Sequence, residues 1–152
     1  MAVSFRCVRN DKVNNYPLAV SQTIAVGDPV ILDANGQVTV AATTSAALLG
    51  VAASACTVSA SGDTIIVHDD PAAEFEGPCD TANQNVQAEV GDTCDIAGST
   101  GAFSLNLDAA SYNVVQVLKI GSYINALLDG TFTTFDPGTL MRFKITAHAL
   151  EN

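Results

Sequence analysis

The sequence predicts an all-β protein, folded as a small barrel or a sandwich. Many short segments alternate apolar and polar residues, turn-forming residues separate them, and no stretch has the periodicity of a long amphipathic helix. Apolar residues make up 48% of the chain, but they are mainly Ala and Val, and Trp is absent. Because β-branched side chains such as Val suit strands, this composition favours sheets. A chain of 152 residues is long enough for one domain with a real core.

The segment DPVILDANGQVTVA predicts the first hairpin. A three-residue loop that ends at Gly36 keeps the apolar side chains of both strands on one face, whereas a two-residue turn does not. In that loop Gly36 adopts the left-handed conformation, which a β-carbon would disfavour. The resulting register pairs Leu32 with Val38 and Val30 with Val40.

Further strands are expected along the rest of the chain. Gly50 and the small residues around it favour a strand over a helix at 49–53, and GDTIIVHDD predicts the next one. Alternation of apolar residues indicates a strand around Leu105, and a buried strand follows at 114–120. In TLMRFKITAHAL the apolar residues alternate with polar ones, among them Arg142 and Lys144, which predicts a half-buried strand with a basic outer face.

Two segments lack a clear strand pattern. The stretch 71–89 is polar and contains Pro71 and Pro78, so we expect it to be a connection or an edge strand. The stretch 123–139 fits either a short helix or a hairpin.

A Gly-Asp pair occurs three times, and each pair precedes a predicted strand. The Gly supplies a permissive backbone and the Asp side chain can accept hydrogen bonds from nearby N–H groups, so we interpret each pair as a corner at which a strand begins. A calcium site shared by the three acids is the alternative, but calcium loops place several oxygen ligands within a short span, and these pairs do not. The residues concerned are Gly27, Asp28, Gly62, Asp63, Gly91 and Asp92.

Charge is distributed unevenly. The net charge is −10, from 6 basic and 16 acidic residues, and the basic ones lie only near the two ends of the chain. From Val13 to Leu118 there is no cation and there are twelve carboxylates. Such a surface repels phosphate groups, so we expect the body of the protein not to bind nucleic acid.

The first 22 residues are polar and weakly periodic, so we predict an extended arm over 1–22 and a single β domain over 23–152. A disordered tail is the alternative. A terminal segment that differs in charge from its body often binds a partner. The candidate partner-binding residues of the arm are Arg6, Arg9, Lys12 and Tyr16.

No catalytic or metal-binding arrangement stands out. His68 and His148 are the only side chains that could act as general bases near neutral pH, and neither lies in a known catalytic motif. The cluster His68–Asp70 has metal-binding atoms, but the sequence suggests no further ligand, and a strand end that runs into a turn explains it equally well. We therefore expect a protein that is not an enzyme, with no cofactor and no metal.

The first residues lack the apolar region of a secretory signal peptide, so we expect synthesis in a reducing cytoplasm. The four cysteines are irregularly spaced and contain no Cys-x-x-Cys pair, which favours free thiols over disulfides. No run approaches the ~20 apolar residues of a membrane-spanning helix, so no membrane partner is expected.

Between Ile24 and Gly121 the chain carries, in order, VGDPVIL, GQV, ALLGVA and SGDTIIV, followed by VGDTCDI, GAFSLNL and VVQVLKIG. The order of these segments resembles that of the small decoration, or cement, proteins that cover the capsids of tailed phages. This resemblance implies a compact β-tulip or small barrel preceded by an N-terminal arm, and a homotrimer bound to the outer surface of an icosahedral head. Its partner would be the major capsid protein, whose neighbouring copies it clamps together.

Two other classes of function stay open at this stage. One is a different structural part of a virion, such as a tail or fibre-base protein. The other is a small carbohydrate-binding or enzymatic β domain, which would show exposed aromatic residues or paired acids in a groove. Phe and Tyr together number nine and Trp is absent, so stacking surfaces for sugars are scarce.

Overall fold

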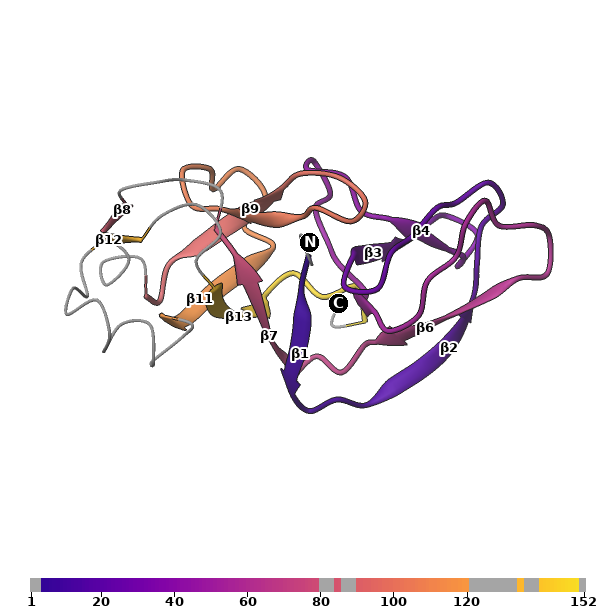
Figure 1. The fold of residues 1–152 in the computed structure, drawn as a ribbon, viewed down its shortest axis with the longest axis horizontal. Helices are drawn as coiled ribbons and strands as arrows, with labels where there is room; N and C mark the ends of the chain where they lie inside the picture. The colour runs from indigo at the N-terminus through magenta and orange to yellow at the C-terminus, as the bar shows by residue number, and fades with distance from the viewer. Residues whose placement is uncertain (1–3, 80–83, 86–89, 121–133, 136–139, 151–152) are drawn as a thin grey trace.

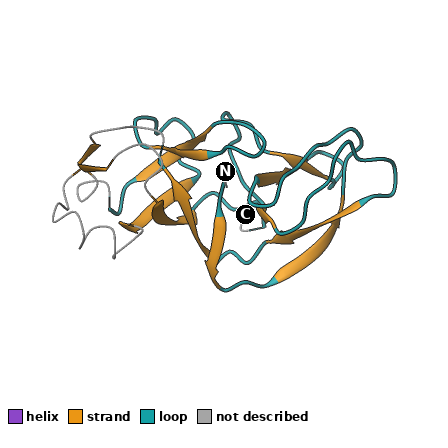
Figure 2. Cartoon of the chain, viewed as in Figure 1, coloured by secondary structure: helices purple, strands orange, loops and turns teal. Residues whose placement is uncertain are grey.

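The computed structural model describes residues 4–79, 84–85, 90–120, 134–135 and 140–150. In this part of the chain the protein forms two antiparallel sheets, of six and five strands, and contains no helix (Figure 2). The all-β prediction is confirmed. Of the two arrangements expected from the sequence, the structure is sandwich-like, and the closed barrel is wrong.

The larger sheet has the strand order β1-β7-β13-β11-β9-β10. In that order its strands are Arg6–Arg9, Glu74–Pro78, Leu140–Ile145, Val115–Ile120, Thr93–Ala97 and Ser104–Asn106. The smaller sheet has the order β2-β6-β5-β3-β4, with strands Val13–Pro17, Thr64–His68, Gly50–Ala52, Pro29–Leu32 and Val38–Val40. A short separate ladder pairs β8 (Gln84–Asn85) with β12 (Thr134–Phe135). Figure 1 shows the two sheets towards opposite ends of the long axis, with β1 near the middle.

The buried apolar residues form two clusters, and the larger one also takes in Val51 of β5 from the smaller sheet. The larger sheet packs around aromatic rings, and the ring of Phe143 lies 4.8 Å from that of Phe5 and 5.7 Å from that of Phe75, measured between centroids. The smaller sheet packs around aliphatic residues such as Val30. Val40 packs against both clusters and so joins the two cores.

The first hairpin has the predicted register. Val30 lies opposite Val40 and Leu32 opposite Val38, and Gly36 has a φ of +72°. The predicted strand at 49–53 is confirmed as β5. The alternation in the last segment is confirmed as well, since β13 buries Met141, Phe143 and Ile145 and leaves its basic residues half-buried.

The sequence-based expectation for 71–89 is wrong for β7. This strand is neither a connection nor an edge, because it lies between β1 and β13 and buries Phe75. Pro71 precedes the strand and Pro78 is its last residue, so neither proline interrupts the ladder. The core-facing positions of β7 carry Phe75 and Gly77, which is too little apolar surface to produce a visible pattern.

The N-terminal segment also differs from the expected arm. Its residues 6–9 and 13–17 form β1 and β2, which pair with β7 and β6. Phe5 belongs to the larger core and Leu18 to the smaller one. The segment is extended, but its two strands are edge strands, β1 of the larger sheet and β2 of the smaller one. Deleting residues 1–22 is therefore expected to damage the fold itself and not only partner binding.

Two other predictions concern the segment 123–139 and the cysteines. Of the segment 123–139, the structure describes only Thr134–Phe135, which is β12. Cys7 and Cys56 are half-buried free thiols. Burial raises the pKa of the Cys7 thiol, whose Sγ donates a hydrogen bond to the carbonyl oxygen of Arg9 at 3.4 Å.

Candidate partner-binding face

The three Gly-Asp pairs are the turns that precede β3, β6 and β9. Their glycines, Gly27, Gly62 and Gly91, have φ angles of +95°, +92° and +96°, and the strand begins one residue after each Asp. A positive φ at this position is typical of a type II turn and favours Gly. In the second copy the N–H of Ala60 donates to Oδ2 of Asp63 at 2.8 Å, so this exposed carboxylate caps its own turn.

Asp28, in the first copy, has a larger structural role because it is completely buried. Its Oδ2 accepts from the N–H of Ala25 at 2.9 Å, which is the same turn bond. Its Oδ1 accepts from the hydroxyl of Ser4 at 2.9 Å and from the N–H of Gly101 at 2.8 Å. The Ser4 oxygen in turn accepts from the N–H of Phe103 at 2.9 Å. Asp28 thus ties together three segments that are far apart in the chain.

The acids that could have formed a metal site are used as hydrogen-bond acceptors. Asp69 accepts from the side-chain amide of Asn14 at 2.9 Å and from the hydroxyl of Tyr16. Asp70 accepts from the N–H of Ala72 at 2.8 Å. Across the residues that the structure describes, no group of three or more His, Cys, Asp or Glu side chains is placed to hold a metal ion.

Tyr16 gives a test of this part of the structure. Burial, followed by the hydrogen bond to Asp69, raises the pKa of Tyr16 from 10 to about 12. The folded protein favours the neutral phenol, so the stabilisation is complete below pH 10 and is lost as the pH rises towards 12. An ultraviolet pH-jump titration of the native protein is expected to show a tyrosine step near pH 12 that is missing in Tyr16→Phe. If the step that Tyr16→Phe removes lay near pH 10, the contact with Asp69 would be contradicted.

The outer face of the larger sheet gathers nearly all the positive charge of the protein. We call this surface the basic face and define it by two rows of side chains that follow the strand register across β1, β7, β13 and β11. The first row is Arg6, Glu76, Arg142 and Lys119, and the second is Arg9, Glu74 and Lys144. Five of the six basic residues of the chain therefore lie here, beside two carboxylates, although the net charge of the protein is −10.

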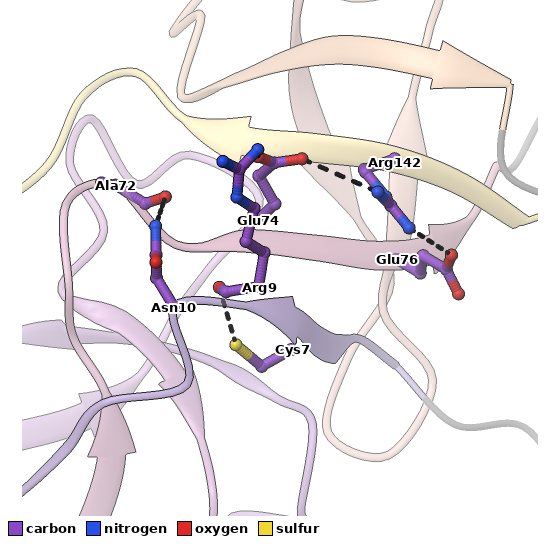
Figure 3. A network of polar contacts seen from close by, with 7 residues as sticks. All are labelled: Cys7, Arg9, Asn10, Ala72, Glu74, Glu76 and Arg142. Atoms are coloured by element: carbon purple, nitrogen blue, oxygen red, sulfur yellow. Dashed lines mark hydrogen bonds and ion pairs between the residues drawn. The ribbon is translucent and has the colours of Figure 1, made fainter.

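Ion pairs lie within each row at its β1 side, and Arg142 of β13 links the two rows. Arg6 contacts Glu76 at 2.6 Å and Arg9 contacts Glu74 at 3.0 Å, measured from guanidinium nitrogen to carboxylate oxygen. Arg142 lies between the two glutamates, 3.4 Å from Glu76 and 3.9 Å from Glu74 (Figure 3). The side chains of Arg6 and Arg9 are 69% and 68% exposed, so each pair is worth at most about 1 kcal/mol. The network orders the face more than it stabilises the fold.

The remaining two cations of the face have no such partner. Within the described ranges no carboxylate oxygen lies within 4 Å of the amino group of Lys119 or Lys144. Glu74 lies directly opposite Lys144 in the register, but its two oxygens contact Arg9 and Arg142. The face thus keeps a surplus of positive charge.

The sequence prediction found only part of this surface. Arg6 and Arg9 belong to the basic face, whereas Lys12 is exposed in the connection between β1 and β2, and Tyr16 turns towards Asp69. The alternation in LMRFKI predicted a basic outer face for β13, but nothing in the local pattern placed β13 near β1. The signal that could have linked the strands is the pair of segments EFEGP and LMRFKI. The first alternates negative charges with Phe and the second alternates positive charges with apolar residues, and opposite charges favour cross-strand neighbours.

No protein-family profile matches this chain, and no curated protein matches it. No helix that could span a membrane occurs in the part of the chain that the structure describes.

Proposed function

We propose that this protein is a structural component of a phage virion, a decoration protein that binds the outer surface of an icosahedral head. Its partner is the major capsid protein, and it acts as a homotrimer with no enzymatic activity and no cofactor. In this proposal the two-sheet body corresponds to the compact β-tulip domain that the sequence resemblance implies. The protein is made in the host cytoplasm and ends on the capsid surface.

The observation that carries this proposal is the separation of charge. One sheet face holds five cations on an otherwise acidic protein, and these cations come from both ends of the chain. Complementary charge orients and selects protein partners more than it adds affinity. Such a face fits attachment to an acidic protein surface. The acidic remainder of the protein repels other acidic surfaces and stays in solvent.

The test is binding to heads assembled without this protein. Lys119→Glu combined with Lys144→Glu is expected to weaken binding by about tenfold in low salt, and by less in high salt, because exposed charges are screened. Neither lysine has an ion pair within the described ranges, so the fold is expected to stay intact, which circular dichroism checks.

The matched control is Lys12→Glu, which changes an exposed cation outside the basic face. Its binding is expected to stay within about twofold of the unmodified protein, since screened exposed charges act locally. Equal binding by all the variants would show that the basic face is not the contact surface. Absence of binding to heads, or binding to isolated tails in their place, would overturn the decoration function.

A further inference from the structure

A hollow of about 830 Å³ opens at one end of the basic face. Arg9 and Asn10, at the end of β1, form one wall, and the turn at 70–72 forms another. Lys144, in β13, and Thr146, directly after this strand, lie on the opposite side of β7 from Arg9. The hollow therefore lies where the second row of the basic face meets the loops that connect the sheets.

The charged groups in this hollow differ in whether they have an ion-pair or hydrogen-bond partner. Glu74 uses its two oxygens for Arg9 and Arg142, as described above, and Asp70 uses Oδ1 for the N–H of Ala72. Lys144 has no carboxylate within 4 Å in the described ranges. Both oxygens of Glu74 and one oxygen of Asp70 thus already have donors, and the amino group of Lys144 is a charge that a ligand can still neutralise.

The walls of the hollow are held in place before any ligand binds. Asn10, which has a φ of +56°, donates from its side-chain amide to the carbonyl oxygen of Ala72 at 2.8 Å (Figure 3). The hydroxyl of Thr146 donates to the carbonyl oxygen of Asn113 at 2.7 Å. A site whose walls are already ordered loses less conformational entropy on binding. The half-buried Leu118 also lines the hollow and gives it an apolar part.

We propose that this hollow binds the carboxylate of an acidic side chain presented by an extended segment of a protein partner. The carboxylate pairs with the amino group of Lys144 and with the exposed guanidinium of Arg9, which uses one nitrogen for Glu74. The methylene groups of the same side chain pack on Leu118. A glutamate fits this combination of a charged end and an apolar stem. Only the identity of the partner, a capsid protein, rests on the proposed function.

The experiment uses the full chain and no capsids. Acetylated and amidated penta-glutamate is titrated into the ¹⁵N-labelled protein, and penta-glutamine is the uncharged control. The expected result is a saturable shift of the amide signals of Asn10, Ala72 and Thr146 with penta-glutamate only. Lys144→Met keeps the aliphatic stem and is expected to weaken this binding by about tenfold, the usual size for a charge-assisted contact.

Lys12→Met is the matched control and is expected to bind penta-glutamate as the unmodified protein does. Equal shifts with penta-glutamine, unchanged affinity in Lys144→Met, or shifts confined to the surroundings of Lys119 would each overturn the site. Because the assay contains no capsids, loss of head binding would overturn the proposed function without affecting this result. A negative titration would overturn the hollow and leave the decoration function standing.

Discussion

Replacing Asp28 with Ala is expected to lower the free energy of unfolding by about 4 kcal/mol, since it leaves several buried donors without an acceptor. The carboxylate is fully buried and accepts from Ser4, Ala25 and Gly101. Ser4 also holds the N–H of Phe103, so the loss extends to the start of the β10 segment. Urea unfolding followed by circular dichroism measures the effect, and an unchanged m-value shows that the variant still unfolds in one step.

Asp63 supplies the control, because it occupies the same position in the second Gly-Asp turn but is exposed. It accepts one turn bond, from Ala60. Asp63→Ala is therefore expected to cost only about 1 kcal/mol, the usual value for a lost capping bond. Equal losses for the two variants would mean that the buried network around Asp28 contributes nothing beyond the turn.

Gly50→Ala is expected to destabilise the protein by about 3 kcal/mol or more. This is the upper end of the range for overpacking, and we expect it because the added β-carbon would meet backbone atoms, which cannot move aside as a side chain can. An added β-carbon would lie 2.0 Å from the carbonyl oxygen of His68 and 2.9 Å from its carbonyl carbon. β5 pairs with β6 at this point and with β3 on its other side, so the strand cannot move away without breaking a ladder. Thermal unfolding is expected to shift down by roughly 6–12 °C in a chain of this size.

Gly62→Ala provides the comparison. An added β-carbon there meets nothing within 4 Å, and the only cost is the φ of +92°. The expected loss is about 1 kcal/mol. If Gly50→Ala were as mild as Gly62→Ala, the close approach of β5 to β6 would be wrong.

Local patterns in the sequence predicted the parts of the fold that depend on neighbours in the chain. The register of the β3–β4 hairpin followed from a loop of three residues and four apolar side chains, and β13 followed from strict alternation. In both cases one face is apolar and the other polar, so a shift by one residue would reverse every side chain. The sequence alone therefore determines these registers.

The N-terminal strands and β7 could not be predicted in this way. β1 directs Cys7 towards the core and has charged residues at both ends, and β7 has one buried aromatic residue between two glutamates. Each strand becomes stable only beside its partners, since it gains its apolar contacts from Phe5 and Phe143 and its outer contacts from ion pairs. The basic face could not be predicted for the same reason. It joins strands that are far apart in the chain, since β1 pairs with β7 and β7 pairs with β13.

The hydrogen-bond network of Asp28, Ser4 and Phe103 has a consequence for biosynthesis. Ser4 leaves the ribosome long before Phe103, its hydrogen-bond partner, and β7 waits for β13 at Leu140–Ile145 before it has a neighbour on each side. Contacts of such long sequence separation slow folding. The first strands therefore cannot pair until residues 64–78 have emerged, and Ser4 cannot bind Phe103 until most of the chain has been made. During that interval the exposed Phe5 and its neighbours are a natural target for chaperones, and the yield of native protein should respond to translation speed.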